Sequence, residues 1–437
     1  MATIYTSIPG MRDILPGQSE KWQYVQRTAL ECAAAFGVRE IRVPTIEKTE
    51  LFVCSLGEAA DVVRNEMYTF DKGGESMTLR PEGTSGTLRA VLEHNLLTAG
   101  ALPLKLCYTA SCFRHDNPQA GRYREFVQFG VEFLGAHPPG GDAELIALAH
   151  DILARLGVVA GGLALHINSV GCPLCQPVYN SALRDYYAAH RGSICATCAD
   201  RLELNPLLLL DCKEDSCRAL APGAPKTADY LCGECATHFD GLQTRLDAIG
   251  LEYTVSSSLV RGLDCYTKTV FEFIPTLEGA QLTVCGGGRY DQLVAEMGGP
   301  HTPAIGFGIG LDRLIMLMEA MGIRFPEEHC CDLYIGSIGE QASIKALQLA
   351  TALRREGRHI LCDTVGRGQA EQMRYAEQVG CAYYCILGTD ELARGGVSVR
   401  RTVDGEGAEV GLSAEGFAAH LDGSANQQLA EYRGVGK

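Results

Sequence analysis

Apolar residues recur at helical spacing from about Glu20 to Phe36, and a glycine follows at Gly37. Spacings of three and four residues gather apolar side chains on one face of a helix, and glycine is the usual residue just past a helix end. Residues 38–44 predict a short strand that ends at Pro44, because proline cannot donate a hydrogen bond within a sheet. The chain therefore begins with a predicted helix and a short predicted strand.

Further periodic segments follow, up to about residue 325. They predict a strand and turn at 77–84, a helix opened by Thr84 at 84–96, two long strands joined by a loop at 104–134, strand character at 253–274, and a glycine-rich strand followed by an apolar helix at 305–322. Residues 170–240 differ from their surroundings, because they are rich in cysteine, leucine and helix-forming residues. We interpret them as an insertion in a domain that spans 1–325.

Beyond a break at 324–329, strand and helix patterns alternate. The predicted order is strand 332–338, helix 340–356, strand 359–363, helix 369–379 and strand 381–387. This alternation is typical of a small α/β domain with a partly parallel sheet, which we place at 331–425. The last residues, 426–437, predict a polar tail.

The predicted strand 122–134 has two unlike faces, because successive side chains of a strand point to opposite sides. Its odd-numbered face is mostly apolar, whereas its even-numbered face consists of Arg122, Arg124, Phe126, Gln128, Gly130 and Glu132. Gly130 would leave a hollow between Gln128 and Glu132, which are about 13 Å apart along a strand. An amino acid with a polar side chain would fit there. The alternative, equally compatible with the pattern, is the solvated outer face of an antiparallel sheet.

Charged residues near this strand would bind the charged groups of a ligand. Arg114 and Arg122 stand at the two ends of the preceding loop, where both would reach one phosphate. Glu82 lies just before a predicted helix and is available to bind an ammonium group. Thr84 has the simpler alternative of capping that helix. Arg261 lies in a strand-like segment, where a single arginine is more often a surface charge.

Glycines mark two further segments. Residues 286–288 would let the backbone approach a ligand closely, or would form a turn. Gly306, Gly308 and Gly310 share one strand face, and a bare face forms a platform on which a planar base can lie. Arg313 follows in the first turn of the next helix. The helix dipole favours anions at that end, so it gives the arginine cation no stabilisation. We therefore expect Arg313 to be held there for an external anion such as a polyphosphate.

Composition limits the class of protein. The chain has 437 residues and a formal net charge of −15, which argues against a general nucleic-acid coat protein. It does not exclude an enzyme that gathers its basic residues into one track. We find no signal peptide, and no apolar run approaches the roughly 18–20 residues that span a bilayer. Nineteen cysteines in such a chain are expected to be thiols or metal ligands. We therefore expect a cytoplasmic protein with no membrane partner.

The insertion concentrates eight of these cysteines in four pairs, three of them with Cys-x-x-Cys spacing. They are Cys172, Cys175, Cys195, Cys198, Cys212, Cys217, Cys232 and Cys235. Two such pairs complete a tetrahedral zinc site, so the insertion predicts one or two structural Zn²⁺ ions. The order of the pairs does not decide which ones share an ion. The alternative is that all eight are free thiols.

Together these segments resemble the class II aminoacyl-tRNA synthetases. The three motifs of that class are resembled, in order, by residues 40–44, 113–133 and 306–314. Within the class, residues 259–266 and 287–291 are similar to the histidyl-tRNA synthetase family. The resemblance runs from Gly10 to about residue 420, with gaps in the cysteine-rich stretch.

The resemblance implies a fold and an activity. The fold would be an α+β catalytic domain with an antiparallel sheet at 1–325, followed by an α/β anticodon-binding domain at 331–425. The activity would be the ATP-dependent activation of L-histidine to histidyl-adenylate, with Mg²⁺, and its transfer to tRNA(His). Because the first motif of the class lies at a dimer interface, a homodimer is also implied.

The resemblance also implies roles for residues at matching positions. Histidine would be bound by Glu82, Thr84 and Gln128 at its α-amino group, and by Glu132, Tyr266 and Tyr290 around its imidazole. Cys265 stands where many members of the family have a second tyrosine, which would loosen the pocket wall. ATP would be held by Arg114, Arg122, Arg261 and Arg313, with Arg114 and Arg261 as the catalytic pair on the α-phosphate. Gln119 would face the acceptor end of the tRNA.

Two other classes of protein remain as alternatives. The first is a catalytically inactive relative that acts as the regulatory subunit of ATP phosphoribosyltransferase. Such a relative usually lacks an anticodon domain and keeps fewer of the motif residues, whereas Arg114, Gln128, Glu132, Arg261 and Arg313 are all present here. The second is a zinc-bearing nucleic-acid module without catalysis, which leaves the polar face of strand 122–134 unexplained.

Overall fold

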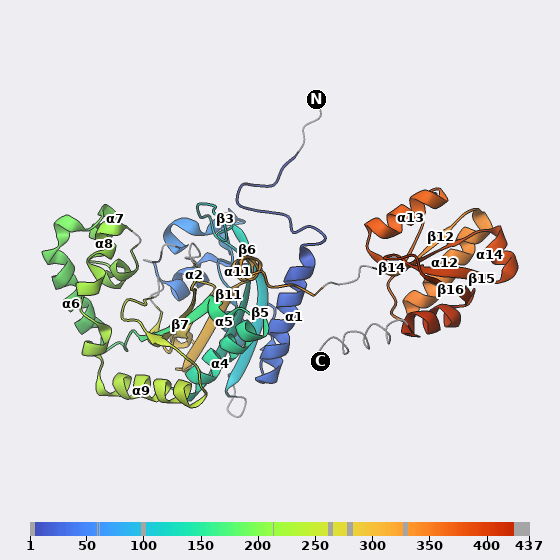
Figure 1. Cartoon of the computed structure of the whole chain (residues 1–437). Coiled ribbons are helices and arrows are strands. Elements are labelled where there is room, and N and C mark those ends of the chain that lie inside the picture. Colours follow the sequence, from blue (N-terminus) through green and yellow to red (C-terminus); the bar gives the residue numbers. More distant parts are fainter. Residues whose placement is uncertain are drawn as a thin grey trace. The chain divides into compact units, whose positions relative to one another are not determined.

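The computed structural model describes residues 5–58, 60, 62–97, 102–212, 214–260, 265–277, 283–326 and 331–423 (Figure 1). The chain forms two compact units, Met1–Phe325 and Pro326–Lys437. Among the described residues, no helix has the length and apolar character needed to cross a membrane.

The first unit is organised by an eight-stranded sheet in the order β1-β5-β6-β11-β10-β9-β7-β8. In that order the strands are Arg39–Glu40, Leu104–Phe113, Glu125–Leu134, Ala304–Gly310, Cys285–Arg289, Thr267–Pro275, Leu163–Ser169 and Thr254–Val255. The six inner strands are antiparallel, and only the two edge pairs, β1 with β5 and β7 with β8, are parallel. The predicted α+β fold with a large antiparallel sheet is confirmed.

Helices cover one face of this sheet. They are α1 (Ser19–Ala35), α4 (Gly140–Arg155), α9 (Gly233–Ala248) and α11 (Leu311–Ala320), with the short α5 (Val159–Gly162) and α10 (Leu293–Glu296) at connections. The odd-numbered residues Phe129, Val131 and Phe133 of β6 are fully buried in the core under these helices. Strand alternation therefore turns the even-numbered face of β6 to the opposite side, as the sequence predicts.

A small three-stranded sheet, β2-β4-β3, is formed by the part of the chain between β1 and β5. Its strand β4 ends three residues before Glu82. Its strands are Ile46–Lys48, Glu75–Leu79 and Tyr68–Lys72, and α2 (Thr49–Leu56), η1 (Val62–Glu66) and α3 (Thr84–Glu93) accompany it. The predicted strand 38–44 is wrong in length, because only Arg39–Glu40 pairs with β5 and residues 41–45 leave the ladder.

The insertion folds as a helical lobe with its own core, drawn in green in Figure 1. Its elements are α6 (Gln176–Ala189), η2 (Arg191–Ser193), α7 (Ala196–Arg201), η3 (Pro206–Asp211), α8 (Asp215–Arg218), η4 (Ala221–Gly223) and η5 (Thr227–Tyr230). Tyr179, Leu183, Tyr187, Leu202 and Leu209 are its main buried apolar side chains. The lobe begins directly after β7 and returns to the first unit through α9.

The second unit has a five-stranded sheet in the order β13-β12-β14-β15-β16. The strands are Ile360–Cys362, Cys331–Ser337, Cys381–Leu387, Gly396–Arg401 and Gly407–Gly411, and the helices are α12 (Glu340–Arg355), α13 (Gln369–Gln378) and α14 (Thr389–Arg394). Strands β12, β13 and β14 are parallel, which confirms the predicted βαβαβ order. The antiparallel hairpin β15–β16 was not predicted from the sequence.

Candidate active site

Two neighbouring cavities lie on the face of the large sheet that turns away from its helical core. We call the first the carboxylate cavity; its lining includes Glu82, Thr84, Tyr108, Gln128, Glu132, Tyr266 and Tyr290. We call the second the arginine cavity; its lining includes Arg114, Arg122, Phe126, Gly286, Gly308, Gly310 and Arg313. Arg114, Gln128, Gly286 and Gly308 line both. The structure thus brings together the residues predicted to bind histidine and ATP, except Arg261, which lies outside the described residues.

Glu132 is the centre of the carboxylate cavity. Its carboxylate accepts hydrogen bonds from the hydroxyls of Thr84 (2.6 Å), Tyr108 (3.4 Å) and Tyr290, and its side chain is almost fully buried. Burial raises the pKa of Glu132 to about 8, even though the three hydroxyl donors favour the charged form. A buried carboxyl with a raised pKa that faces a cavity is typical of a group that binds a ligand.

The hollow predicted above Gly130 is filled by the side chain of Tyr108. The two residues are partners in the ladder between β5 and β6, and a Cβ on Gly130 would lie 2.2 Å from Cζ of Tyr108. The phenol ring therefore fills the space above the glycine, and its hydroxyl lies 3.4 Å from both Gln128 Oε1 and Glu132 Oε1. The sequence did not identify Tyr108, because its position depends on the register of β5 against β6.

The glycines of β11 also differ from the predicted flat platform. Gly306 pairs with Glu132, and a Cβ there would lie within 1.8 Å of the Glu132 carboxylate. A Cβ on Gly308 would lie 2.5 Å from Nε2 of Gln128. These two glycines therefore make room for polar side chains of the neighbouring strand. Of the three, only Gly310 has a more open face, where a Cβ would meet Arg313 at 3.9 Å.

Glu82, and not Thr84 as the alternative above suggested, caps the start of helix α3. The N-cap of α3 is Gly83, and the Glu82 carboxylate accepts hydrogen bonds from the backbone N–H groups of Thr84 and Ser85 (3.0 Å to Ser85). Thr84 is the first helical residue, and its hydroxyl donates to Glu132 instead of capping the helix. Both residues still line the carboxylate cavity.

The arginines of the second cavity are held in different ways. Arg114 donates from Nε to the carbonyl of Pro81 (2.9 Å), and its guanidinium lies 5.5 Å from the ring of Phe126; among the described residues it forms no ion pair. Arg313 donates to the carbonyls of Gly121 (2.8 Å) and Thr283 (3.0 Å). Backbone carbonyls therefore help to orient both guanidinium groups, and both side chains line the cavity.

Arg122 differs from the prediction in its partners and in its place. It lies before β6, which begins at Glu125, and pairs with Gln119 in a turn. Its guanidinium forms ion pairs with Asp116 and, at 3.8 Å, with Glu66, so part of its charge is already compensated. Gln119 is exposed in the same turn.

Tyr266 and Tyr290 complete the wall of the carboxylate cavity. The Tyr266 ring packs over Gly288, where a Cβ would lie 2.7 Å from its Cδ1. Tyr290 is buried, and burial together with the neighbouring Glu132 raises its pKa well above the usual value, so the phenol is protonated. Cys265 lines the same cavity. Arg261 lies outside the described residues.

The glycines 286–288 lie in a strand and do not form a turn, and Gly286 lines both cavities. Residues Cys285–Arg289 form the buried strand β10, in which Gly287 and Gly288 allow close contact with β11 and Tyr266. The next residue, Arg289, is fully buried and pairs with Asp142 and Asp291. Burial alone would raise the pKa of Asp142, but hydrogen bonding to His238 and Arg289 holds it below its usual value.

The substitution Arg289→Met is expected to lower the free energy of unfolding of the first unit by about 3–5 kcal/mol, because it removes the only cationic side chain that the described residues pair with both buried carboxylates, Asp142 and Asp291. The single tryptophan of the chain, Trp22, is buried in this unit, so its fluorescence reports the transition. Arg155→Met on the exposed end of α4 is the control and should change the same quantity by less than about 0.5 kcal/mol. A loss below about 1 kcal/mol for Arg289→Met would contradict the structural role of this network.

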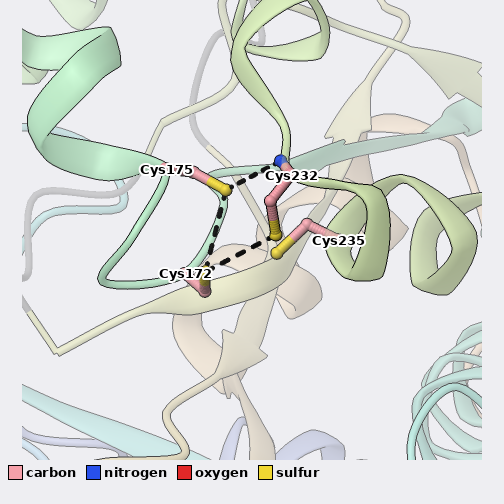
Figure 2. A group of neighbouring side chains, drawn as sticks. All are labelled: Cys172, Cys175, Cys232 and Cys235. Carbon is pink, nitrogen blue, oxygen red and sulfur yellow. Dashed lines mark hydrogen bonds between the residues drawn. The ribbon is translucent and has the colours of Figure 1, made fainter.

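The eight cysteines of the insertion form two clusters, each of which combines two pairs. The first cluster is Cys172, Cys175, Cys232 and Cys235, and the second is Cys195, Cys198, Cys212 and Cys217; within each, the sulfurs lie within 4.8 Å of one another. Figure 2 shows the four side chains of the first cluster pointing toward a common centre. The structure therefore suggests a pairing that the sequence left open.

Comparisons with known proteins agree with this fold and site. The model of the histidyl-tRNA synthetase family matches residues 10–184 and 213–314, and an anticodon-binding domain model matches residues 332–425. The solved apo histidyl-tRNA synthetase of S. aureus superposes with a TM-score of 0.79 and 34% identity, covering 96% of this chain and 99% of that one. The large antiparallel sheet with its two cavities, followed by the second unit, is the arrangement of a class II aminoacyl-tRNA synthetase.

Curated relatives define the family within this class. The histidine–tRNA ligase of Desulforamulus reducens is 46% identical and that of Acetivibrio thermocellus 45% identical, each over 92% of this chain and 96% of the relative. The chain belongs to the histidyl-tRNA synthetase family. A Bacillus halodurans structure titled as an ATP phosphoribosyltransferase regulatory subunit/histidyl-tRNA synthetase shares the fold, with a TM-score of 0.62 and 23% identity. The identities to the ligases support the enzyme over the regulatory alternative.

Proposed function

We propose that the protein activates L-histidine with ATP and transfers it to tRNA(His). The observation that carries this proposal is the wall shared by the two cavities, which includes Arg114 and Gln128. An amino acid in the carboxylate cavity would present its carboxylate at this wall, where the α-phosphate of ATP in the arginine cavity would meet it. Histidine-dependent exchange of pyrophosphate into ATP tests this reaction.

Histidine fits the polar groups of the carboxylate cavity. A neutral imidazole has one hydrogen-bond donor and one acceptor, so Glu132 would accept from one nitrogen while the phenol of Tyr266 donates to the other. The α-amino group would lie among Glu82, Thr84 and Gln128. Because each carboxylate oxygen accepts more than one hydrogen bond, Glu82 can cap α3 and still bind an ammonium group.

In the arginine cavity the protein would stabilise phosphate charge. Arg114 and Arg261 would hold the α-phosphate, Arg122 would assist, and Arg313 would hold the γ-phosphate, so that in-line attack by the histidine carboxylate expels pyrophosphate. Mg²⁺ would supply further positive charge on the phosphates. The lining carboxylates of Asp116 and Asp312 already pair with arginines, so the ion would be carried chiefly by the phosphates.

Transfer to tRNA would use surfaces outside the two cavities. Gln119 is exposed in the turn that precedes β6, where it would meet the acceptor end of tRNA(His). The second unit, matched by the anticodon-binding model, would bind the anticodon. The proposed reaction needs tRNA and ATP, so it would take place in the cytoplasm.

We propose a homodimer that forms through the region after β1. A groove of about 1040 Å³ lies there, and its lining includes Ile41, Val43, Pro44, Leu51, Leu92 and Met297. Residues 41–44, which follow the short edge strand β1, line the groove, so a second copy would cover an apolar surface next to a sheet edge.

Light scattering at micromolar concentration should give twice the chain mass of 47.0 kDa. Leu51→Glu places a charge in the groove and should increase the monomer fraction, whereas Leu204→Glu, at an exposed leucine of the insertion, should not. A wild-type protein that is monomeric at this concentration would exclude the proposed interface.

We also propose that each cysteine cluster binds one structural Zn²⁺. A tetrahedral ion with Zn–S bonds of about 2.3 Å separates its sulfurs by roughly 3.8 Å. The sulfurs lie 3.7 Å apart for Cys172 and Cys175, 3.9 Å for Cys172 and Cys232, and 3.9 Å for Cys195 and Cys212. These distances are too long for disulfides and close to the spacing of sulfurs around one tetrahedral ion.

A further inference from the structure

The two cysteine clusters occupy different places in the insertion. The second cluster draws its ligands from residues 195–217 and holds helices of the lobe to one another. The first cluster joins Cys172 and Cys175, just after β7, to Cys232 and Cys235 at the start of α9. It therefore closes the insertion where its two ends leave the catalytic sheet, and an ion there would fix that junction.

Three hydrogen bonds connect this junction to the segment that carries Tyr266. Gln176, next to Cys175, donates from Nε2 to the Tyr266 carbonyl (3.1 Å). The backbone N–H of Lys268 donates to the carbonyl of Gly171, next to Cys172 (2.7 Å). The Lys268 ammonium donates to Glu234, between the other two cysteines (2.8 Å). Three residues next to the cysteines of the cluster thus contact residues 266–268.

The backbone of this segment needs such support. Lys268 has φ of +54°, a conformation that costs free energy for residues other than glycine and persists only where the surroundings impose it. Tyr266, two residues earlier, packs its ring over Gly288 and forms part of the wall of the carboxylate cavity. A shift of residues 266–268 would therefore displace a side chain of the proposed histidine site.

From this connection we infer that Zn²⁺ in the first cluster positions Tyr266, and so sets the affinity of the carboxylate cavity for histidine. The ion in the second cluster stabilises the lobe only. The inference rests on the proposed function for the identity of the ligand, but the metal and the contacts are properties of the chain alone. The ion acts at a distance through Gln176 and Lys268, so it is a positioning element and takes no part in the chemistry.

The experiment uses the full chain, purified without chelator, with zinc measured by mass spectrometry and histidine binding by calorimetry. Wild type should contain two zinc ions per chain. Cys172→Ser and Cys195→Ser replace the first ligand of each cluster, and both thiols are half-buried, so they form a matched pair. Each variant should lose one ion.

Cys172→Ser should raise the Kd and KM for histidine about 10-fold, an effect of the size that the loss of supporting contacts around a metal site commonly has on activity. The KM for ATP should be unchanged. Cys195→Ser should leave all three constants within about twofold.

A second variant tests the coupling without touching a ligand. Gln176→Ala should retain two zinc ions and still raise the Kd for histidine, and it decides the matter if Cys172→Ser does not fold. Equal effects of the two cysteine variants, or an unchanged Kd in Gln176→Ala, would overturn the coupling. Fewer than one zinc ion per chain in wild type, or iron in its place, would contradict the proposal that the clusters bind zinc. Absence of histidine activation by a zinc-replete wild type would instead reject the proposed function.

Discussion

Replacing Arg114 with alanine is expected to lower the rate of histidine activation by about 10²–10³, the usual effect of removing one donor that stabilises charge in the transition state. Arg114 lies in the wall shared by the two cavities, and its Nε is anchored to the carbonyl of Pro81. Negative charge grows on the α-phosphate at that wall as pyrophosphate leaves. Histidine affinity should change much less, because the contacts of Glu132 remain.

Single-turnover formation of the adenylate, measured at several histidine concentrations, separates these two quantities. Arg114→Lys keeps the charge but loses the planar fork that binds two phosphate oxygens, so it should recover only part of the rate. Arg155→Ala removes an exposed arginine of α4 and should leave the rate unchanged. Similar losses of rate and of histidine affinity in Arg114→Ala would argue against a role in the transition state.

The substitution Glu132→Gln is expected to reduce kcat/KM for histidine by about 10³ or more. Glutamine has nearly the same shape, so Thr84, Tyr108 and Tyr290 keep a partner, but its amide is a weaker acceptor for an imidazole N–H. Sites that pair buried polar groups with their substrate lose about 10⁴–10⁵ when such a pair is broken. The KM for ATP should be nearly unchanged, since Glu132 does not line the arginine cavity.

The same variant should change how stability depends on pH. Burial raises the pKa of Glu132 to about 8 in the folded protein, well above the value of an exposed carboxyl. The folded state therefore holds this proton more tightly than the unfolded state. The stability contributed by the group is complete below about pH 4.3, the usual pKa of glutamate, and is lost as the pH rises through about 8.

The Glu132→Gln variant should not lose stability in this pH range, because the glutamine side chain does not ionise. Its melting temperature, followed by the fluorescence of Trp22, should exceed that of wild type, by more at pH 8 than at pH 5. Glu252→Gln, at an exposed glutamate of the same unit, is the control and should show no such trend. A difference between Glu132→Gln and wild type that shrinks as the pH rises would show that Glu132 is ionised in the free protein.

Periodicity predicted the elements whose side chains have one buried face. Helix α1 and its end before Gly37, the pair β5–β6, and the order β12-α12-β13-α13-β14 follow the pattern of apolar residues closely. Parity along β6 also separated the core face from the face that lines the cavities. These successes share a cause, because alternation and helical spacing depend only on residues close in sequence.

Contacts between distant strands could not be predicted in the same way. Tyr108 over Gly130, Glu132 over Gly306, and the capping of α3 by Glu82 depend on register and on the local turn. The pairing of the cysteines depends on the path of the chain through the lobe. Arg122 differs from the prediction for a similar reason, since one of its acidic partners, Glu66, lies in another segment.

The measurement that tests the account most directly is the exchange of labelled pyrophosphate into ATP by the purified chain with each amino acid in turn. The two cavities and their shared wall predict exchange that requires histidine and Mg²⁺, needs no tRNA, and is lost in Arg114→Ala and Glu132→Gln. Exchange should be absent with the other standard amino acids. A folded wild-type protein that binds ATP but shows no histidine-dependent exchange would contradict the proposed function.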